Sequence, residues 1–279
     1  MRRRQRTGWR RYVNGLYLAT AVIVLFVLLP IVWMVLSSFK GPSSIATSSW
    51  LPHPWSTANY TSAFSQYTFG RYILNSVIVA VCTTALVLAL GIMAGYALGR
   101  LPMRGKLPLL MVLLMISVFP AIAVIAPLFL IMKSIHFLNS YQALILPYTA
   151  FNLPFAIWIL RNYFMGIPKE MEETGRIDGA SPLRTVWSIV LPQAAPGVFT
   201  AGIFTFTACW TEFLMSLSFN SVNAFRTIPV GIALFGSNYT VPFGDIFAAS
   251  CVAAIPIALL VLVFRKSVVS GLTSGAVKG

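Results

Sequence analysis

The sequence predicts an all-α membrane protein that crosses the bilayer six times. Its 279 residues are 58% hydrophobic and only 9% charged, whereas soluble globular domains carry about 25% charged residues. The charged residues are also unevenly spread and separate six long apolar stretches. Each stretch is close to or above the ~20 residues that a helix needs to cross a hydrocarbon core of about 30 Å. The composition does not fit a soluble fold, and we treat residues 1–279 as a single membrane domain.

The predicted spans follow from the intervals between charged residues. They cover approximately residues 14–37, 72–98, 107–132, 138–160, 195–217 and 246–264. The first span follows an Arg-rich start and resembles a secretory signal, but it is too long for one and no A-x-A site closely follows it. The third span contains Pro120 and Pro127, and the fourth contains Pro147 and Pro154. Neighbouring helices must satisfy the carbonyls that these prolines free, so we expect a packed bundle of kinked helices.

The basic residues predict that both chain termini are cytoplasmic. With the N-terminus inside, 16 of the 20 Lys and Arg residues face the cytoplasm, and only Lys40, Arg71, Lys133 and Arg226 lie outside. The inverted topology would violate the positive-inside rule. The net charge of +14 is thus scattered over loops that flank the membrane, which argues against nucleic-acid binding. The two larger external segments are then residues 40–70 and 220–244.

Residue types that perform catalysis or bind metals are sparse. His53 and His136 lie far apart in external segments, and the three cysteines fall singly inside apolar spans with no CxxC pair. A buried thiol is commonly a small packing residue. The phosphate-binding pattern GxxxxGK[ST] is absent, so ATP hydrolysis would require another chain. We therefore expect no catalytic residue, no metal site and no cofactor in this chain.

The polar segment between the fourth and fifth predicted spans, residues 168–192, differs from its apolar surroundings. It contains four of the chain's six acids, which are Glu170, Glu172, Glu173 and Asp178. Pro168 suits a first helical turn, and Gly179 suits a left-handed helix end. Ser181 followed by Pro182 suits the start of a second helix. We predict two short helices, the second passing through Trp187 to about Val190.

The same segment carries a spaced signature. Permease subunits of binding-protein-dependent ABC importers contain the cytoplasmic pattern EAA-x3-G-x9-I-x-L-P, and Glu173, Gly179, Ile189, Leu191 and Pro192 fall at those spacings. The surrounding IPKEMEE and IDGASPLRT, together with WTEF at 210–213 and SGLTSGAVKG at 270–279, are similar to the sugar (MalG-like) branch of that family. The chain departs from the pattern at its two alanines, which are Thr174 and Gly175. It also has Val186 where the family often has phenylalanine.

The resemblance implies an ABC type I importer permease fold in which residues 168–192 form a coupling helix that docks on an ATPase subunit. The docking residues it implies are Glu172, Glu173, Gly179, Ala180, Ser181, Pro182, Val186 and Trp187. It also implies that the C-terminal tail reaches between two ATPase subunits, through Ser274, Gly275, Val277 and Lys278. Without the resemblance, the acids have a second interpretation: they solvate an inner loop and favour the helix dipole.

The resemblance further implies the partners and the cargo. It implies a second homologous permease subunit in a heterodimer, two ATPase subunits that bind ATP and Mg, an extracytoplasmic sugar-binding protein, and the lipid of a bacterial or archaeal cytoplasmic (inner) membrane. The expected cargo is a mono-, di- or oligosaccharide. Glycerol-phosphate or another small polar solute is an alternative cargo, and an ion-coupled secondary carrier is an alternative class. The spans offer no basic group for phosphate and few ionisable groups for ion coupling.

Polar residues inside the predicted spans are candidates for a translocation pathway. Glu212 is the only acid in an apolar span, and an acid at the bilayer centre costs about 2.5–3.5 kcal/mol on insertion scales. Its alternative place is near the outer boundary, tied to Trp210 or to a neighbouring helix without touching substrate. The weaker candidates, whose hydroxyls and amides also serve to join helices, are Asn75, Ser117, Asn152, Thr205 and Thr207.

Overall fold

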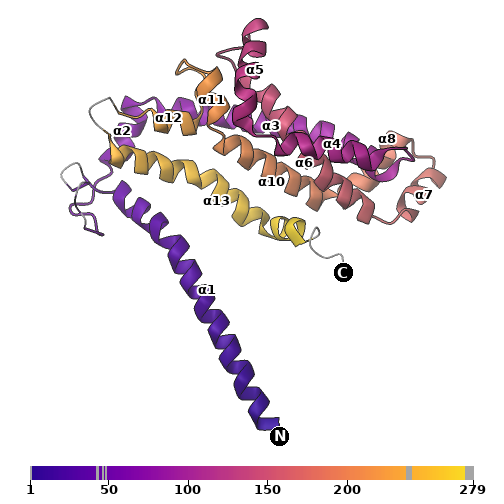
Figure 1. Cartoon of the computed structure of the whole chain (residues 1–279), viewed down its shortest axis with the longest axis horizontal. Coiled ribbons are helices and arrows are strands. Elements are labelled where there is room, and N and C mark those ends of the chain that lie inside the picture. The colour runs from indigo at the N-terminus through magenta and orange to yellow at the C-terminus, as the bar shows by residue number, and fades with distance from the viewer. Residues whose placement is uncertain (1, 42–43, 46, 48, 237–240, 274–279) are drawn as a thin grey trace. The chain divides into compact units, whose positions relative to one another are not determined.

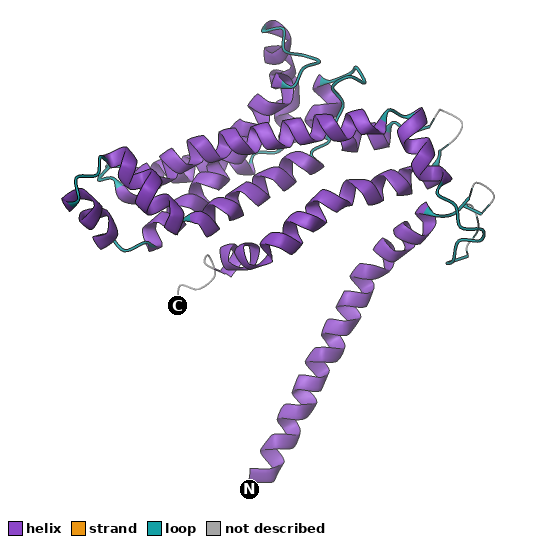
Figure 2. Ribbon diagram, turned by 180° about the vertical axis from the view of Figure 1, so that it is seen from behind, coloured by secondary structure: helices purple, strands orange, loops and turns teal. Residues whose placement is uncertain are grey.

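The structure is a computed structural model that describes residues 2–41, 44–45, 47, 49–236 and 241–273. Helices dominate this part of the chain (Figure 2), and it contains no strand beyond an isolated bridge between Lys40 and Trp55. The prediction of an all-α fold is confirmed. The chain divides into two compact units, Met1–Thr68 with Phe235–Val252 and Phe69–Leu234 with Ala253–Gly279. The single-domain assignment stays a prediction.

The first unit contains α1 (Arg2–Ser38), α2 (Ala58–Gln66) and the beginning of α13 (Phe243–Thr273). The part of α1 from Gly15 to Ser38 is long and apolar enough to cross a membrane, and its side chains are exposed from residue 15 to residue 32. Helix α2 was not predicted, since it falls in the expected external loop. The buried amide of Asn59 fixes α2 by donating to the carbonyls of Ser38 (2.9 Å) and Lys40 (2.7 Å).

The second unit is built around α3 (Phe69–Arg100), α6 (Gln142–Gly166) and α10 (Ala195–Thr211), which lie side by side in Figure 1. Their shared core includes the fully buried Val87, Leu160 and Phe164. Glycines recur at every fourth position of α3 where it meets α6: Gly91, Gly95 and Gly99. A Cβ atom added to Gly95 would lie 3.0 Å from the Leu160 Cβ, so these small residues allow the two backbones to approach closely.

A sharp bend divides the third predicted span. Helices α4 (Lys106–Val118) and α5 (Ala121–Ser134) meet at 90°. The residue before a proline is disfavoured in helical conformation, and Phe119, before Pro120, is extended with φ −65° and ψ 133°. The expected kink is confirmed, and the pair forms either one broken span or a re-entrant loop, so the span over 107–132 stays a prediction.

The fifth predicted span, 195–217, is also interrupted. Helix α10 ends at Thr211, and α11 (Leu214–Phe219) begins after a break at Glu212 and Phe213. A further short helix, α12 (Ile228–Ala233), lies in the expected second external loop. In the described residues, four helices are long and apolar enough to cross a membrane, or up to six if each bent helix pair is one span. The count of six therefore stays a prediction.

Four short helical pieces connect α6 to α10. They are α7 (Glu170–Ile177), α8 (Pro182–Arg184), the π-helix η1 (Thr185–Val190) and α9 (Leu191–Gln193). We name residues 168–193 the polar hairpin, with α7 as its first arm and α8, η1 and α9 as its second arm.

Candidate functional site

The backbone of the polar hairpin follows most of its predicted local signals, although Pro168 precedes α7, which begins at Glu170, and does not lie in its first turn. Helix α7 has three acids in its first turn, and Gly179 adopts the left-handed conformation with φ +75° after the helix ends. Ser181 caps α8, because its Oγ accepts the N–H of Arg184 (3.3 Å), and Pro182 occupies the first turn. The prediction of two short helices separated by a glycine turn is confirmed.

The second arm is longer than predicted. Helical structure continues through η1 and α9 to Gln193, so Pro192 lies within the arm instead of ending it. The chain then bends by 80° into α10. Val190 is fully buried in the same core as α3 and α6, so the second arm is anchored on the helix bundle. π-helical turns are rare and often occur at functional sites.

The two arms pack against each other at one of the departures from the signature. A Cβ atom added to Gly175 would lie 2.3 Å from the Cδ1 of Ile189. Glycine at this position therefore leaves room for Ile189, and the departure has a packing explanation. The other substituted alanine, Thr174, is exposed, and its hydroxyl donates to the carbonyl of Glu170 (2.8 Å).

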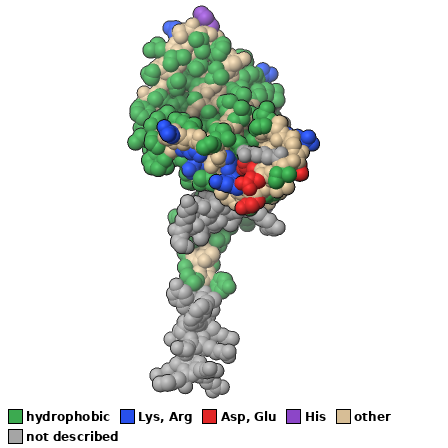
Figure 3. All heavy atoms as spheres, turned by 90° about the vertical axis from the view of Figure 1, so that its right-hand side faces the viewer, with side chains coloured by type: hydrophobic (Ala, Val, Ile, Leu, Met, Phe, Trp, Pro, Cys, Tyr) green, Lys and Arg blue, Asp and Glu red, His purple; other side chains and the backbone are tan. Residues whose placement is uncertain are grey.

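The outer face of the polar hairpin combines an acid with large apolar side chains. Glu173 is exposed, and Ile177, Leu183 and Trp187 are 85%, 68% and 51% exposed. Figure 3 shows acidic and basic side chains gathered at this end of the unit on a surface that is otherwise mainly hydrophobic. Exposed apolar groups next to charges are typical of a protein contact surface. We name these four residues the outer face.

The remaining implied docking residues lie close to the outer face. Gly179, Ser181 and Pro182 are exposed, whereas Ala180 and Val186 are partly buried. Ile177 and Leu183 were missed by the sequence reasoning. An isoleucine or leucine in a short helix is normally a core residue, and only the packing of the two arms shows that these two side chains point outward. The tail residues Ser274, Gly275, Val277 and Lys278 lie outside the described residues.

Glu172 requires a correction, because it does not lie on the outer face. It is buried, and its Oε1 lies 2.9 Å from the Nε of Arg100, the last residue of α3. Its Oε2 accepts the hydroxyl of Tyr96 (3.0 Å). Successive residues of a helix point about 100° apart, so when Glu173 faces outward, its neighbour Glu172 turns toward α3.

Of the predicted pathway residues, Asn75 is fully buried and its polar atoms are used within the chain. Its amide donates to the carbonyls of Ala224 and Arg226 (both 2.9 Å), and its oxygen accepts the hydroxyl of Tyr141 (2.9 Å). These contacts join α3 to α6 and to the segment before α12. Asn75 therefore joins helices by hydrogen bonds, which is the alternative to a pathway role for polar residues in spans.

Glu212 lies at the break between α10 and α11 and caps the second helix. Its two carboxylate oxygens accept the N–H groups of Met215 (2.8 Å) and Ser216 (3.2 Å), and the hydroxyl of Tyr148 in α6 also donates to it. The expected alternative of a tie to a neighbouring helix thus has a structural basis. Trp210 does not provide that tie, since its indole N–H donates to the carbonyl of Ala253 (3.0 Å).

The other pathway candidates are only partly brought together. Asn152 donates to the carbonyl of Tyr148 (2.8 Å), the residue whose hydroxyl reaches Glu212. Ser117 has one long contact to the carbonyl of Phe151 (3.5 Å), Thr207 is partly buried and Thr205 is buried. Asn152 thus contacts the main-chain carbonyl of Tyr148, Glu212 accepts its hydroxyl, and Asn75 lies in a separate network.

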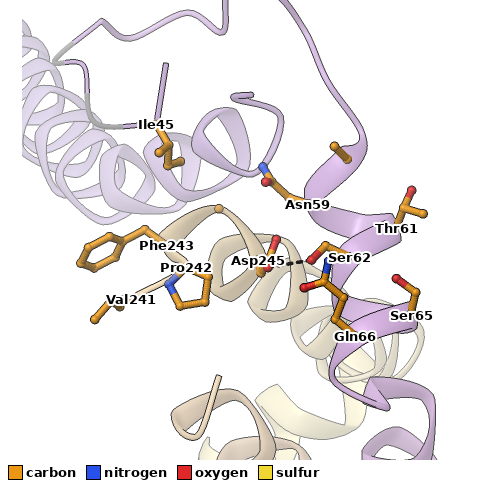
Figure 4. A pocket seen from close by; sticks show the side chains of 12 residues that line it. Ile45, Asn59, Thr61, Ser62, Ser65, Gln66, Val241, Pro242, Phe243 and Asp245 are labelled. Atoms are coloured by element: carbon orange, nitrogen blue, oxygen red, sulfur yellow. Dashed lines mark hydrogen bonds between the residues drawn. The ribbon is translucent and has the colours of Figure 1, made fainter. Parts of the chain in front are cut away.

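A hollow in the first unit, with a volume of about 880 Å³, was not predicted. Figure 4 shows that α2 and the start of α13 line it, with the Oγ of Ser62 donating to Asp245 (2.8 Å). Burial, and to a lesser extent the Asp245 carboxylate, raises the pKa of nearby Tyr67 above its ordinary value. The sequence signal was weak, because Ser62 and Asp245 are 183 positions apart.

Groups that could bind a metal are not found in the described part of the chain, where no three His, Cys, Asp or Glu side chains gather. The expectations that this chain holds no catalytic residue, metal or cofactor stay predictions.

Comparison with known proteins identifies the family. The family described as "Binding-protein-dependent transport system inner membrane component" matches residues 87–269, which is more than half of the chain. The chain belongs to this family. Its members are membrane permease subunits of ABC importers and not enzymes, and separate ATPase subunits hydrolyse ATP. The resemblance inferred from the signature is confirmed.

Curated relatives match over nearly the whole length of the chain. The sulfoquinovosyl glycerol transport system permease protein SmoH of Agrobacterium fabrum is 39% identical, covering 94% of this chain and 93% of its own. The trehalose/maltose transport system permease protein MalG of Thermococcus litoralis is 38% identical over 93% of both chains. The trehalose transport system permease protein SugB of Mycobacterium tuberculosis is 38% identical over 98% of this chain and 100% of its own.

Solved structures support the fold. A chain of a bacterial ABC transporter involved in the import of the acidic polysaccharide alginate superposes with a TM-score of 0.80 at 19% identity, covering 92% of this chain and 96% of its own. A chain of the MetNI methionine ABC transporter in an inward-facing conformation gives a TM-score of 0.56 at 17% identity over 73% and 95%. At these identities the likeness concerns the fold alone, and it confirms an importer permease fold.

Proposed function

We propose that this family member imports a sugar and forms half of the translocation pathway, with the polar hairpin as the element that couples it to an ATPase subunit. The observation that carries the coupling is the outer face: an acid and three large apolar side chains held outward on a segment anchored at Val190. A solvated inner loop would not require exposed Ile177, Leu183 and Trp187. A cleft on an ATPase subunit would bury them.

The names of the relatives support a carbohydrate as cargo. SmoH, MalG and SugB are named for sulfoquinovosyl glycerol, trehalose/maltose and trehalose, and each is 38–39% identical to this chain. The absence of a basic residue within the six sequence-predicted spans also favours a neutral solute over a phosphorylated one, because a phosphate would be stabilised by Lys or Arg.

The proposed assembly contains this chain, a second homologous permease subunit, two ATPase subunits that hold ATP and Mg, and an extracytoplasmic sugar-binding protein. A solved alginate importer in complex with an oligosaccharide-bound periplasmic protein has a chain of the same fold, with a TM-score of 0.67. The distribution of basic residues supports cytoplasmic termini and a cytoplasmic polar hairpin. The hollow beside Asp245 then belongs to the extracytoplasmic side.

A direct role for the pathway candidates is part of the proposal. Glu212 is its best supported member, because it lies at the break between α10 and α11. Asn152 lies within α6 and donates to the main-chain carbonyl of Tyr148. Where a transmembrane helix of a transporter is discontinuous, its unwound backbone exposes polar groups that can contact a solute. Thr207 and Ser117 are weaker members, and Asn75 has a complete set of internal hydrogen bonds.

The experiment that tests the proposal is uptake by the whole complex in proteoliposomes, with the binding protein outside and ATP inside. Radiolabelled trehalose, maltose and glycerol 3-phosphate are compared, with and without the ATPase subunits. We expect uptake of a neutral sugar that requires ATP and the ATPase subunits. Uptake without these subunits, or uptake of the phosphorylated solute alone, would contradict the proposal.

A further inference from the structure

The inner side of α7 carries an ion pair that is almost completely buried. The side chains of Arg100 and Glu172 are 6% and 9% exposed, and their charged atoms lie 2.9 Å apart. Arg100 is the last residue of α3, and Glu172 lies in the first turn of α7. The pair therefore joins the end of a bundle helix to the arm that carries part of the outer face.

Further contacts surround this pair. Arg100 Nη2 donates to the carbonyl of Ile167, the residue that directly follows α6. The Tyr96 hydroxyl, one helical turn before Arg100, donates to Glu172 (3.0 Å), and its ring packs edge-on against Phe164 of α6 (5.8 Å between ring centroids). Arg100 thus contacts both the chain that enters α7 and the first turn of α7.

Stability alone is a poor explanation for such a pair. Removing two charges from water is costly, and well-packed apolar residues of similar volume often stabilise a protein as well or better. Apolar contacts already hold α7 in place, since Met171 packs against the core that contains Val87 and Leu160. What the ion pair adds is an electrostatic link between α7 and α3 at 2.9 Å, beside the hydrogen bond that the Tyr96 hydroxyl of α3 donates to Glu172.

The covalent connections of the polar hairpin make this link distinctive. The chain joins α7 to α6 and joins the second arm to α10, but no covalent connection leads from the hairpin to α3. Helix α3 also packs closely on α6 through Gly91 and Gly95. A displacement at the outer face would reach α6 and α10 through the chain and α3 through its packing on α6. Glu172 and Arg100 add a direct contact between α7 and α3.

We propose that Arg100 and Glu172 are positioning residues that make α3 move with α7, so that force received at the outer face reaches the bundle through α3 as well as through the chain. The inference rests on the proposed function and deepens it by naming the internal route. Tyr96 orients the carboxylate in this arrangement. Glu173, the next residue of the same turn, points about 100° away from Glu172, faces the partner and takes no part in the internal link.

The test replaces the pair by two methionines, Arg100→Met with Glu172→Met, in the complete importer. Unbranched apolar side chains fill the volume of the pair but lack its charges and the acceptor for the Tyr96 hydroxyl. Assembly, ATP hydrolysis and sugar uptake are measured on the same proteoliposomes. We expect normal assembly, a hydrolysis rate within about twofold of the wild type, and about tenfold less uptake per ATP, which corresponds to roughly 1.4 kcal/mol.

Matched controls are the exposed neighbours Arg104 and Glu170. Arg104→Gln removes a positive charge just after α3, and Glu170→Gln removes a negative charge at the start of α7. Both variants should keep the wild-type uptake per ATP. A second variant, Glu172→Gln, keeps the acceptor for Tyr96 and should show an intermediate loss. A graded loss across these variants is the signature of a positioning role.

The outcomes are distinguishable from those of the proposed function. If the wild-type complex shows no ATP-dependent sugar uptake, the proposed function fails. If the wild type transports and the double-methionine variant retains full uptake per ATP, the inference is wrong and the pair serves only packing. If the double-methionine variant does not assemble, the inference is also wrong, because the pair is then needed for folding and not for coupling.

Discussion

The polar hairpin and the break between α10 and α11 are both interruptions of the helical bundle, yet they arise differently. The hairpin is built from local signals, with Gly179 at φ +75° and Ser181 capping α8. The break between α10 and α11 falls at Glu212 and Phe213, neither of which is a helix-breaking proline or glycine. It is stabilised by a carboxylate that caps the next helix and binds Tyr148 from another helix. One interruption depends on short-range chemistry, and the other depends on tertiary contacts.

The difference extends to what each region contacts. The hairpin directs large apolar side chains outward, where substitutions should weaken binding to a partner without unfolding the chain. The break at Glu212 directs its carboxylate inward, so substitutions there should change stability before they change binding. This contrast can be tested by four substitutions.

The largest effect is expected for Trp187→Ala on the outer face. Truncation of a central interface tryptophan typically costs about 2 kcal/mol or more, which corresponds to about 30-fold weaker binding. We therefore expect weaker retention of the ATPase subunits on the purified permease pair, measured by surface plasmon resonance, with unchanged thermal unfolding. Met165→Ala, an exposed apolar residue of α6 outside the hairpin, is the control. Equal losses for both variants would contradict a specific outer face.

The next effect is expected for Glu212→Ala. It removes the acceptor for the N–H groups of Met215 and Ser216 and for the Tyr148 hydroxyl. Loss of a helix cap and of buried hydrogen bonds costs about 2 kcal/mol, and the complex should unfold at a lower temperature in detergent. Glu212→Gln keeps one acceptor oxygen, so its free energy of unfolding should fall by about half as much. If Glu212→Ala left stability unchanged, the capping role would be wrong; a loss of uptake would then come from the proposed pathway role alone.

A smaller effect is expected for Gly179→Val. A residue with a Cβ atom in the left-handed conformation costs roughly 1–2 kcal/mol, although open space surrounds this position. The hairpin amides should exchange hydrogen faster, as measured by mass spectrometry over residues 170–190. Gly166→Ala is the matched control, because this glycine also has open space around it but no positive φ. Faster exchange in the control would refute a backbone explanation.

The smallest effect is expected for Ser181→Ala, which removes the cap of α8. The cost is about 1 kcal/mol and is confined to the second arm, since a cap acts on the first helical turn. Hydrogen exchange should quicken at residues 183–186 and remain unchanged in α7. Ser181→Asp retains an acceptor and should restore slow exchange; if it does not, the hydroxyl has another role.

Much of the hairpin was predictable because its signals lie within a few residues of one another. Gly179, Ser181 and Pro182 each favour one backbone conformation by their own covalent structure. The second arm ends at Gln193 and not at about Val190, because Pro192 does not end the helical structure. A proline is tolerated in the first turn of a helical piece, and the preceding π-turn supplies a place for it.

The sequence by itself determined the all-α membrane class, the apolar stretches, the hairpin turn and the family signature, because composition and local residue preferences are properties of the chain alone. Only the tertiary structure decided that Glu172 turns inward to Arg100 while Glu173 faces out, and that Asn75 and Glu212 satisfy partners on other helices. Adjacent acids have the same local preferences. Their different roles arise from contacts with residues that are distant in sequence and become neighbours only when the helices pack.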